Sequence, residues 1–387
     1  MDDLILGEAL DLLIDNRGKN PPYVAEGIPV ISAKAVKRGA ILMEEARHIS
    51  EDTYLRWMPN ELQINDVILT SEAPLGECAL VTDERPLAIA QRLYGLRGKP
   101  GVLDGRYLYY ALRTHGVQAD LHSRSSGSTV AGIRQPELLK VRIPNPGHAV
   151  QLAIAEVLGA LDDKIVVNDR IATTADSLRS ACYLGAHADA PGEFRQEALS
   201  SMAEFINGRP FTKDATGAGR MVVRIAELNS GPGGSTVYNE IEVPEKHLAR
   251  PGDVLFAWSG SLTVARWFRP EAIVNQHIFK VVPKDDRPMW LVLELLRLKL
   301  DEFRAIAADK ATTMGHIQRR HLDETVLTPN AAMTQKLDVQ IGPLWDRALA
   351  AEQESLKIAN LRDTLLPQLM SGKLRVRDAE KIVEDTV

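Results

Sequence analysis

Apolar and small residues recur at alternating steps of four and three in two stretches of the chain, about 148–184 and 333–370. The first series is Ile154, Leu158, Leu161, Ile165, Asn168, Ala172 and Ala175. The second is Leu337, Ile341, Leu344, Ala348, Ala351, Ser355 and Ile358. This heptad spacing predicts two long helices with a coiled-coil seam. At a rise of ~1.5 Å per residue, each rod of about 36 residues is roughly 50 Å long.

Two arrangements would bury these apolar stripes. Each helix could pack only on its own globular domain, as ordinary amphipathic helices do. Rods longer than a small domain is wide more simply bury their seams against each other, and we expect an antiparallel pair. The stretches that precede each helix instead contain short β-type runs broken by Gly and Pro: GIPVIS (27–32), DVILTS (66–71) and MVVRI (221–225). A helix is predicted at 290–303.

The chain also repeats itself. INDVILTSEAPLG (64–76) matches PGDVLFAWSGSLT (251–263), and the later segments 88–97, 127–138, 159–165 and 178–183 match 272–281, 311–322, 343–349 and 361–366. The offsets are 187, 185, 184, 184 and 183 residues, in chain order. A preserved order with slow drift is what duplication followed by loop insertions leaves, so we expect a tandem repeat.

These patterns together predict an α+β fold in which two mixed domains alternate with two long helices, as a pseudo-twofold internal repeat. The expected boundaries are 1–147 and 185–332 for the mixed domains, 148–184 and 333–372 for the helices, and 373–387 for a C-terminal tail.

Composition limits the function classes. The formal net charge of -6 argues against a polybasic nucleic-acid binder, although a local basic face stays possible. The two cysteines, Cys78 and Cys182, lie far apart, so we expect a reducing cytoplasm and no zinc site. No apolar run approaches the ~20 residues of a membrane helix, and the acidic N-terminus lacks the basic flank of a signal peptide.

One tetrapeptide suggests catalysis. Asn20-Pro21-Pro22-Tyr23 has the form of the adenine-N6 methyltransferase loop that holds a flipped base. Such an enzyme also needs a Gly-rich cofactor loop that follows a strand and opens a helix. The nearest candidate, TGAGR (216–220), instead precedes a β-type run. We therefore interpret the tetrapeptide as a chance match in a proline-stiffened loop.

Three longer segments carry a family resemblance. RGKNPPYVAEGIPVISAKAVKRG (17–39), QLAIAEVLGALDDKIVVNDRI (151–171) and LRDTLLPQLMSGKLRV (361–376) resemble the specificity subunits of type I restriction–modification enzymes. The resemblance implies a non-catalytic subunit in which each mixed domain, a target recognition domain, reads half of a bipartite double-stranded DNA site. The paired helices would set the spacing and dock two adenine-N6 methyltransferase subunits, and a restriction and translocation subunit would join them. S-adenosylmethionine, ATP and Mg²⁺ would belong to these partners.

Two alternatives stay open: a stand-alone adenine-N6 methyltransferase, and a two-module DNA-binding regulator without a modification partner. Under the preferred hypothesis, DNA contacts should come from polar loops at equivalent positions of the repeat. In the first domain these are Arg17, Lys19, Lys34, Ser71, Gln91, Arg92, Arg124, Ser126, Ser128, Thr129 and Arg134. In the second they are Lys213, Arg224, Trp258, Ser259, Gln276, His277, Lys310, Thr312, Thr313, Arg319 and Arg320.

Overall fold

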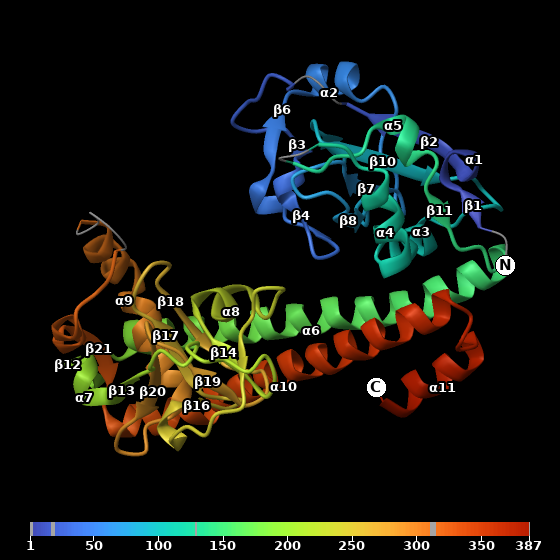
Figure 1. Cartoon of the computed structure of the whole chain (residues 1–387). Helices are drawn as coiled ribbons and strands as arrows, with labels where there is room; N and C mark the ends of the chain where they lie inside the picture. Colours follow the sequence, from blue (N-terminus) through green and yellow to red (C-terminus); the bar gives the residue numbers. More distant parts are fainter. Residues whose placement is uncertain (1–2, 17–19, 128–129, 310–314, 387) are drawn as a thin grey trace. The chain divides into compact units, whose positions relative to one another are not determined.

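The computed structural model describes residues 3–16, 20–127, 130–309 and 315–386. It has the mixed helix and sheet composition that the sequence predicts, so the α+β class is confirmed. Contacts divide the chain into two compact units (Figure 1). Unit 1 comprises Met1–Asp163 and Ile358–Val387, and unit 2 comprises Lys164–Lys357. The domain boundaries proposed from the sequence stay a prediction.

Unit 1 is built on an antiparallel four-stranded sheet with the order β2-β10-β7-β8. Its strands are β2 (Leu10–Asp15), β10 (Leu93–Gly98), β7 (Val67–Thr70) and β8 (Cys78–Leu80). The other strands are β6 (Arg47–Ile49), β3 (Ile28–Ile31) and β9 (Ala88–Ile89) in one sheet, and the pairs β1 (Leu4–Ile5) with β11 (Arg142–Ile143) and β4 (Val36–Lys37) with β5 (Ala40–Ile41). The helices are α1 (Leu6–Ala9), α2 (Glu51–Trp57), α3 (Gly105–Leu112), α4 (His115–Ser123), α5 (Gln135–Leu138) and α11 (Val376–Thr386), with 3-10 turns η1 (Ala33–Ala35) and η2 (Met43–Glu45).

Unit 2 has the corresponding four-stranded order, β13-β20-β17-β18. These strands are β13 (Ala203–Asn207), β20 (Ile278–Pro283), β17 (Val254–Ala257) and β18 (Thr263–Arg266). A second sheet contains β15 (Tyr238–Asn239), β14 (Arg220–Val223), β19 (Ala272–Val274) and β16 (Leu248–Ala249), and β12 (Phe194–Ala198) pairs with β21 (Thr325–Pro329). The helices are α7 (Leu199–Met202), α8 (Ile225–Ser230) and α9 (Met289–Asp309), with 3-10 turns η3 (Pro191–Glu193), η4 (Glu245–His247) and η5 (Arg319–Asp323).

The main four-stranded sheets of the two units correspond strand by strand, as do the pairs β1–β11 and β12–β21, which confirms the repeat. Each has one parallel pair in its second sheet, β3 with β9 and β14 with β19. The acid before the central strand is also repeated, as Asp66 and Asp253. Each carboxylate accepts a hydrogen bond from the backbone N–H three residues earlier, at 2.8 and 2.7 Å. Each also pairs with a cation of the neighbouring strand, Arg97 at 2.7 Å and Lys280 at 2.9 Å.

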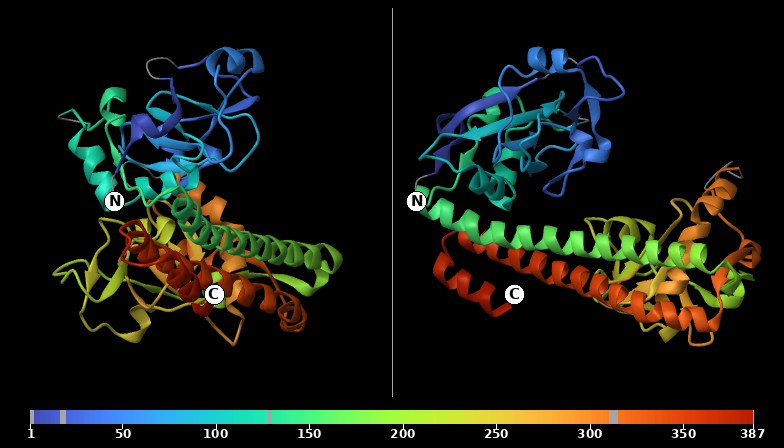
Figure 2. Two further views of the ribbon diagram at one scale, coloured as in Figure 1. Left: turned by 90° about the vertical axis from the view of Figure 1, so that its right-hand side faces the viewer. Right: turned by 180° about the vertical axis from the view of Figure 1, so that it is seen from behind.

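The two heptad stretches form α6 (His148–Asp189) and α10 (Ala331–Met370). Within unit 2 their segments run antiparallel (Figure 2). The helices are joined there by a small apolar cluster that contains Ala172 and Ala175 of α6 and Ala348 and Ala351 of α10. Alanines at these positions allow close approach of the two backbones.

The seam residues predicted from the sequence have several environments. Ile154, Leu158 and Leu161 of α6 and Ile358 of α10 are buried within unit 1, and Ile165 is half-buried. In unit 2, Leu344 packs on the alanine cluster. Leu337 and Ile341 instead join the large core, together with aromatic and aliphatic side chains of α9 and the strands. The heptad pattern of α10 therefore serves both a neighbouring helix and a globular core.

Buried ion pairs attach each globular part to a long helix. Arg179 of α6 has a fully buried side chain and pairs with the carboxylate of Glu294 of α9, whose side chain is 3% exposed. Arg362 of α10 is the repeat equivalent of Arg179, and it pairs with Asp162 of α6 in unit 1. The Tyr110 hydroxyl of α3 donates to the same Asp162 carboxylate at 2.6 Å. The two equivalent arginines therefore pair with different elements, Arg179 with α9 and Arg362 with the other long helix.

Candidate DNA-recognition surface

The candidate surface of unit 1 is built on the end of β7. The Ser71 N–H donates to the Arg92 carbonyl at 2.9 Å, and the Ile133 N–H donates to the Ser71 carbonyl at 2.9 Å. Glu72 and Gly132 form a β-bridge next to these bonds. Three loops far apart in the sequence are therefore fixed side by side by backbone hydrogen bonds.

Unit 2 repeats this backbone arrangement with different side chains. The Trp258 N–H donates to the His277 carbonyl at 3.1 Å, and the Ile317 N–H donates to the Trp258 carbonyl at 3.1 Å. Ser259 and His316 form the corresponding bridge. The offsets relating these residues to unit 1 are those found in the sequence, so a shared backbone frame presents Ser71, Glu72 and Arg92 in one unit and Trp258, Ser259 and His277 in the other.

Two adjoining hollows lie over this frame in unit 1, with volumes of about 410 and 580 Å³. Gln91 and Arg92 line both of them. Among the residues predicted from the sequence, Lys34 lines the first hollow, and Ser71, Ser126 and Arg134 line the second. The structure thus brings together six of the predicted residues of this domain.

The first hollow also contains residues that the sequence reasoning did not select, namely Asn20, Tyr23, Glu45 and Arg47. The Arg47 guanidinium lies over the Tyr23 ring, 4.7 Å from its centroid. The sequence criterion was a polar residue in a loop, and Arg47 does not meet it because it is the first residue of strand β6. Only the pairing of β6 with β3 brings it to this hollow, so the sequence offered little sign of it.

Acidic side chains hold two of the predicted arginines of unit 1. Arg92 pairs through Nε with Glu72 at 2.8 Å, and both side chains are substantially exposed, at 52% and 38%. Arg124 pairs with Asp120 at 2.8 Å and lies 4.0 Å from Glu137. Exposed ion pairs of this kind contribute little to stability, and the Glu72 pair leaves the two terminal amino groups of Arg92 to other partners.

Aromatic rings dominate the unit 2 surface. The centroid of the half-buried Trp258 ring lies 5.2 Å from that of His277, 5.8 Å from Phe279 and 6.3 Å from His316. Its indole N–H donates to Asn207 Oδ1 at 2.9 Å. The Trp258 ring is therefore held by a hydrogen bond, and the exposed imidazole of His277 lies beside it with its plane tilted by 52°.

Arg224 has a mainly structural set of contacts. Its guanidinium donates to Glu227 at 2.9 and 2.5 Å and to the Ser235 carbonyl at 2.6 Å. Burial alone would raise the pKa of Glu227, but hydrogen bonds from Arg224 and Thr236 outweigh it and lower that pKa. Arg224 thereby closes the loop after α8.

The other predicted residues fall into two groups. In unit 2, Ser259 is buried, whereas Lys213, Gln276, Arg319 and Arg320 are exposed. Seven lie outside the described residues: Arg17, Lys19, Ser128, Thr129, Lys310, Thr312 and Thr313.

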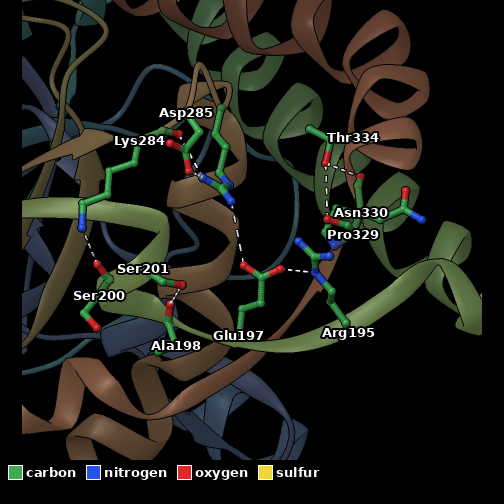
Figure 3. A network of polar contacts seen from close by, with 11 residues as sticks. Arg195, Glu197, Ala198, Ser200, Ser201, Lys284, Asp285, Pro329, Asn330 and Thr334 are labelled. Carbon is green, nitrogen blue, oxygen red and sulfur yellow. Dashed lines mark hydrogen bonds and ion pairs between the residues drawn. The ribbon is translucent and has the colours of Figure 1, made fainter.

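Unit 2 also contains a network of polar contacts that connects structural elements to one another (Figure 3). Lys284 donates to the Ser200 carbonyl at 2.8 Å, and Arg287 pairs with Asp285 at 2.6 Å. Glu197 of β12 accepts from Arg195 and lies 3.8 Å from Arg287. These cations connect β12 and α7 to the turn before α9, so we do not count them among the candidate DNA contacts.

Within the part of the chain that the structure describes, no group of three or more His, Cys, Asp or Glu side chains could hold a metal ion. Of the two methyltransferase-like segments, TGAGR leads into β14, and Asn20 and Tyr23 line the first hollow. TGAGR therefore does not open a helix, as a cofactor loop does.

Comparison with known families identifies the first repeat. Residues 18–174 match the family described as the type I restriction modification DNA specificity domain. Over these residues the chain is similar to the type I DNA specificity domain. This match includes both hollows of unit 1 and the first part of α6. The family resemblance suggested by the sequence is thereby confirmed.

The similarity to specificity subunits extends beyond the specificity domain. The type I restriction enzyme MjaIX specificity subunit of Methanocaldococcus jannaschii is 24% identical over 92% of this chain and 84% of its own length. The MjaVIII specificity subunit of the same organism is 25% identical over 42% of this chain and 39% of its own length. The S subunit of a type I restriction–modification system from M. genitalium has a TM-score of 0.58 at 15% identity, covering 95% of both chains, and so shares the fold.

Among the residues that the structure describes, no helix is both long enough and apolar enough to cross a membrane.

Proposed function

We propose that this chain is the DNA-recognition subunit of a type I restriction–modification complex and has no catalytic activity of its own. Each globular part would read one half of a bipartite site in double-stranded DNA. The observation that carries this proposal is the specificity domain at 18–174 combined with the recurrence of its backbone frame in unit 2. A subunit that reads two half-sites needs two such surfaces, and the same backbone hydrogen bonds occur in both units.

The long helices would have two tasks, setting the distance between the half-sites and docking two adenine-N6 methyltransferase subunits. S-adenosylmethionine, ATP and Mg²⁺ would then be bound by the methyltransferase and by a restriction and translocation subunit. Such a complex would act on DNA inside the cell, so we propose a cytoplasmic location.

Methylome sequencing tests the recognition role directly. A host that expresses this chain with its methyltransferase should carry N6-methyladenine in one bipartite motif. The methyltransferase expressed without this chain is the control, and it should leave that motif unmodified. Methylation that does not depend on the chain would refute the proposal.

Charge reversal tests the DNA surface of unit 2. Arg319→Glu with Arg320→Glu should weaken binding to all sequences and reduce the slope of log affinity against log salt by about 0.9 for each lost phosphate contact. The matched control reverses Arg347 and Lys357, two exposed cations of α10. An unchanged affinity and salt slope would exclude the Arg319–Arg320 loop from the DNA surface.

The spacing role is tested by lengthening the helix. Four residues inserted near Asn168 in α6 should lengthen the gap between the half-sites by about one to two base pairs, since four residues rise ~6 Å along a helix and one base pair spans ~3.4 Å. The gap is read from the methylated motif. An unchanged gap would mean that α6 does not set the distance.

A further inference from the structure

The turn before β10 in unit 1 and the turn before β20 in unit 2 each contain a residue with a left-handed backbone conformation. Arg92, between β9 and β10, has φ 71°, and His277, between β19 and β20, has φ 73°. Residues other than Gly are disfavoured in this left-handed region, and a strained residue that is found there often has a functional role. Both side chains are exposed, so packing in the core does not explain why a residue other than Gly occupies either position.

The backbone at these two positions is fixed, while the side chain differs. The carbonyls of Arg92 and His277 accept the bonds from Ser71 and Trp258 that hold the recognition frame together, at 2.9 and 3.1 Å. Gly at these positions would make the same bonds without strain. The two units therefore share the backbone conformation of this turn and differ in the side chain that it carries.

In unit 1 this side chain is placed to reach a ligand. Arg92 lines both hollows, and its Nε is paired with Glu72 at 2.8 Å. A carboxylate on Nε orients the guanidinium plane and directs donation through the two terminal amino groups. Two parallel N–H donors match the O6 and N7 acceptors of guanine in the major groove.

The unit 2 side chain offers different chemistry. The imidazole of His277 lies beside the Trp258 ring, with centroids 5.2 Å apart and an interplanar angle of 52°. An imidazole has no pair of parallel donors, so it does not provide the fork that a guanidinium presents. The equivalent position of unit 2 therefore offers different hydrogen-bonding groups.

We propose that the left-handed residue of this turn is the base-reading position of each unit, with Arg92 selecting a guanine in one half-site and His277 occupying the equivalent place in the other. This inference rests on the proposed function, because it assigns the contact that makes the two halves different.

In vitro selection from random duplex DNA tests this assignment. The selection uses the full-length chain, alone and with its co-purifying methyltransferase. Arg92→Gly should lose one guanine from the unit 1 half of the motif, with discrimination at that base pair reduced roughly 5- to 150-fold. Arg92→Lys keeps the charge but not the planar fork, so it should reduce that discrimination by less, and its affinity for non-specific DNA and its salt slope should stay close to wild type. His277→Arg should add a guanine preference to the other half.

Arg38→Gly is the matched control, since Arg38 also has a left-handed backbone (φ 52°) and an exposed side chain in unit 1 but lines neither hollow. It should leave the motif intact. Melting temperatures separate the roles, because Arg92→Gly relieves backbone strain and should melt at or above the wild-type temperature. A motif unchanged by all three turn variants, or an Arg92→Gly protein that melts lower and loses all DNA binding, overturns the assignment. A wild-type chain that selects no motif in either form overturns the proposed function itself.

Discussion

The buried pair between Arg179 and Glu294 allows a quantitative test of what holds unit 2 to its helix. Glu294 is almost fully buried and accepts hydrogen bonds from Arg179 and from the Ser180 hydroxyl, the latter at 3.0 Å. The Nε of Arg179 lies 3.4 Å from Asp176. Burial lowers the pKa of Arg179, and the Glu294 charge opposes that shift. Neither charge has access to water, so each depends on the other.

Arg179→Met keeps the length of the side chain and removes its charge. Glu294 would keep only Ser180, and an uncompensated buried charge costs about 3–5 kcal/mol. For a unit of this size, each kcal/mol lowers the melting temperature by about 2–4 °C, so we expect a decrease of roughly 6–20 °C. Calorimetry or circular dichroism of the full chain would measure it.

Two further variants show whether the charge pair is the cause. Replacing both partners, as Arg179→Met with Glu294→Leu, should recover most of the loss, because no unpaired charge remains. Arg362→Met is the matched control in unit 1, where Asp162 is 25% exposed and keeps its bond from Tyr110, so its cost should be smaller. A loss below about 1 kcal/mol for Arg179→Met, or a double variant no more stable than the single one, would refute the reasoning.

Three further predictions follow from the burial and the charge of single residues. Because Arg224 and Thr236 lower the pKa of Glu227 despite its burial, the stability that Glu227 contributes is fully present above its ordinary pKa of 4.5 and is lost as the pH falls through the lower, folded value. In urea unfolding, the advantage of wild type over Glu227→Gln should therefore shrink in acid, and a difference independent of pH would contradict this. Burial raises the pKa of the Cys78 thiol to about 12, so a thiol reagent should modify the half-exposed Cys182 first, and equal rates would count against the fold around β8. The amide of the buried Asn168 makes no hydrogen bond with any described residue, so Asn168→Leu should raise the free energy of unfolding by about 1 kcal/mol or more, whereas a loss would indicate a hidden partner.

The contacts of the arginines show why sequence reasoning selects a candidate surface more readily than its individual residues. Loop position and polarity led to the turn that contains Gln91 and Arg92, because the repeat marks it twice in the sequence. The same criteria also selected Arg124 and Arg224, whose guanidinium groups are engaged by neighbouring carboxylates. A sequence does not show which cation is already paired, since the pairing acids come from other turns of the fold.

The sequence by itself determined the features that depend on local periodicity and internal similarity. The heptad pattern marked α6 and α10 to within a few residues because a helix repeats its environment every three or four positions. The duplicated segments predicted one topology used twice, since equivalent apolar runs form equivalent strands.

Only the tertiary structure decided what depends on contacts between distant segments. It placed Arg47 and Tyr23 beside Arg92, and it gave Arg92 and His277 the same left-handed backbone. Those features arise where strands from separate parts of the chain meet, and no pattern along a single segment encodes that meeting.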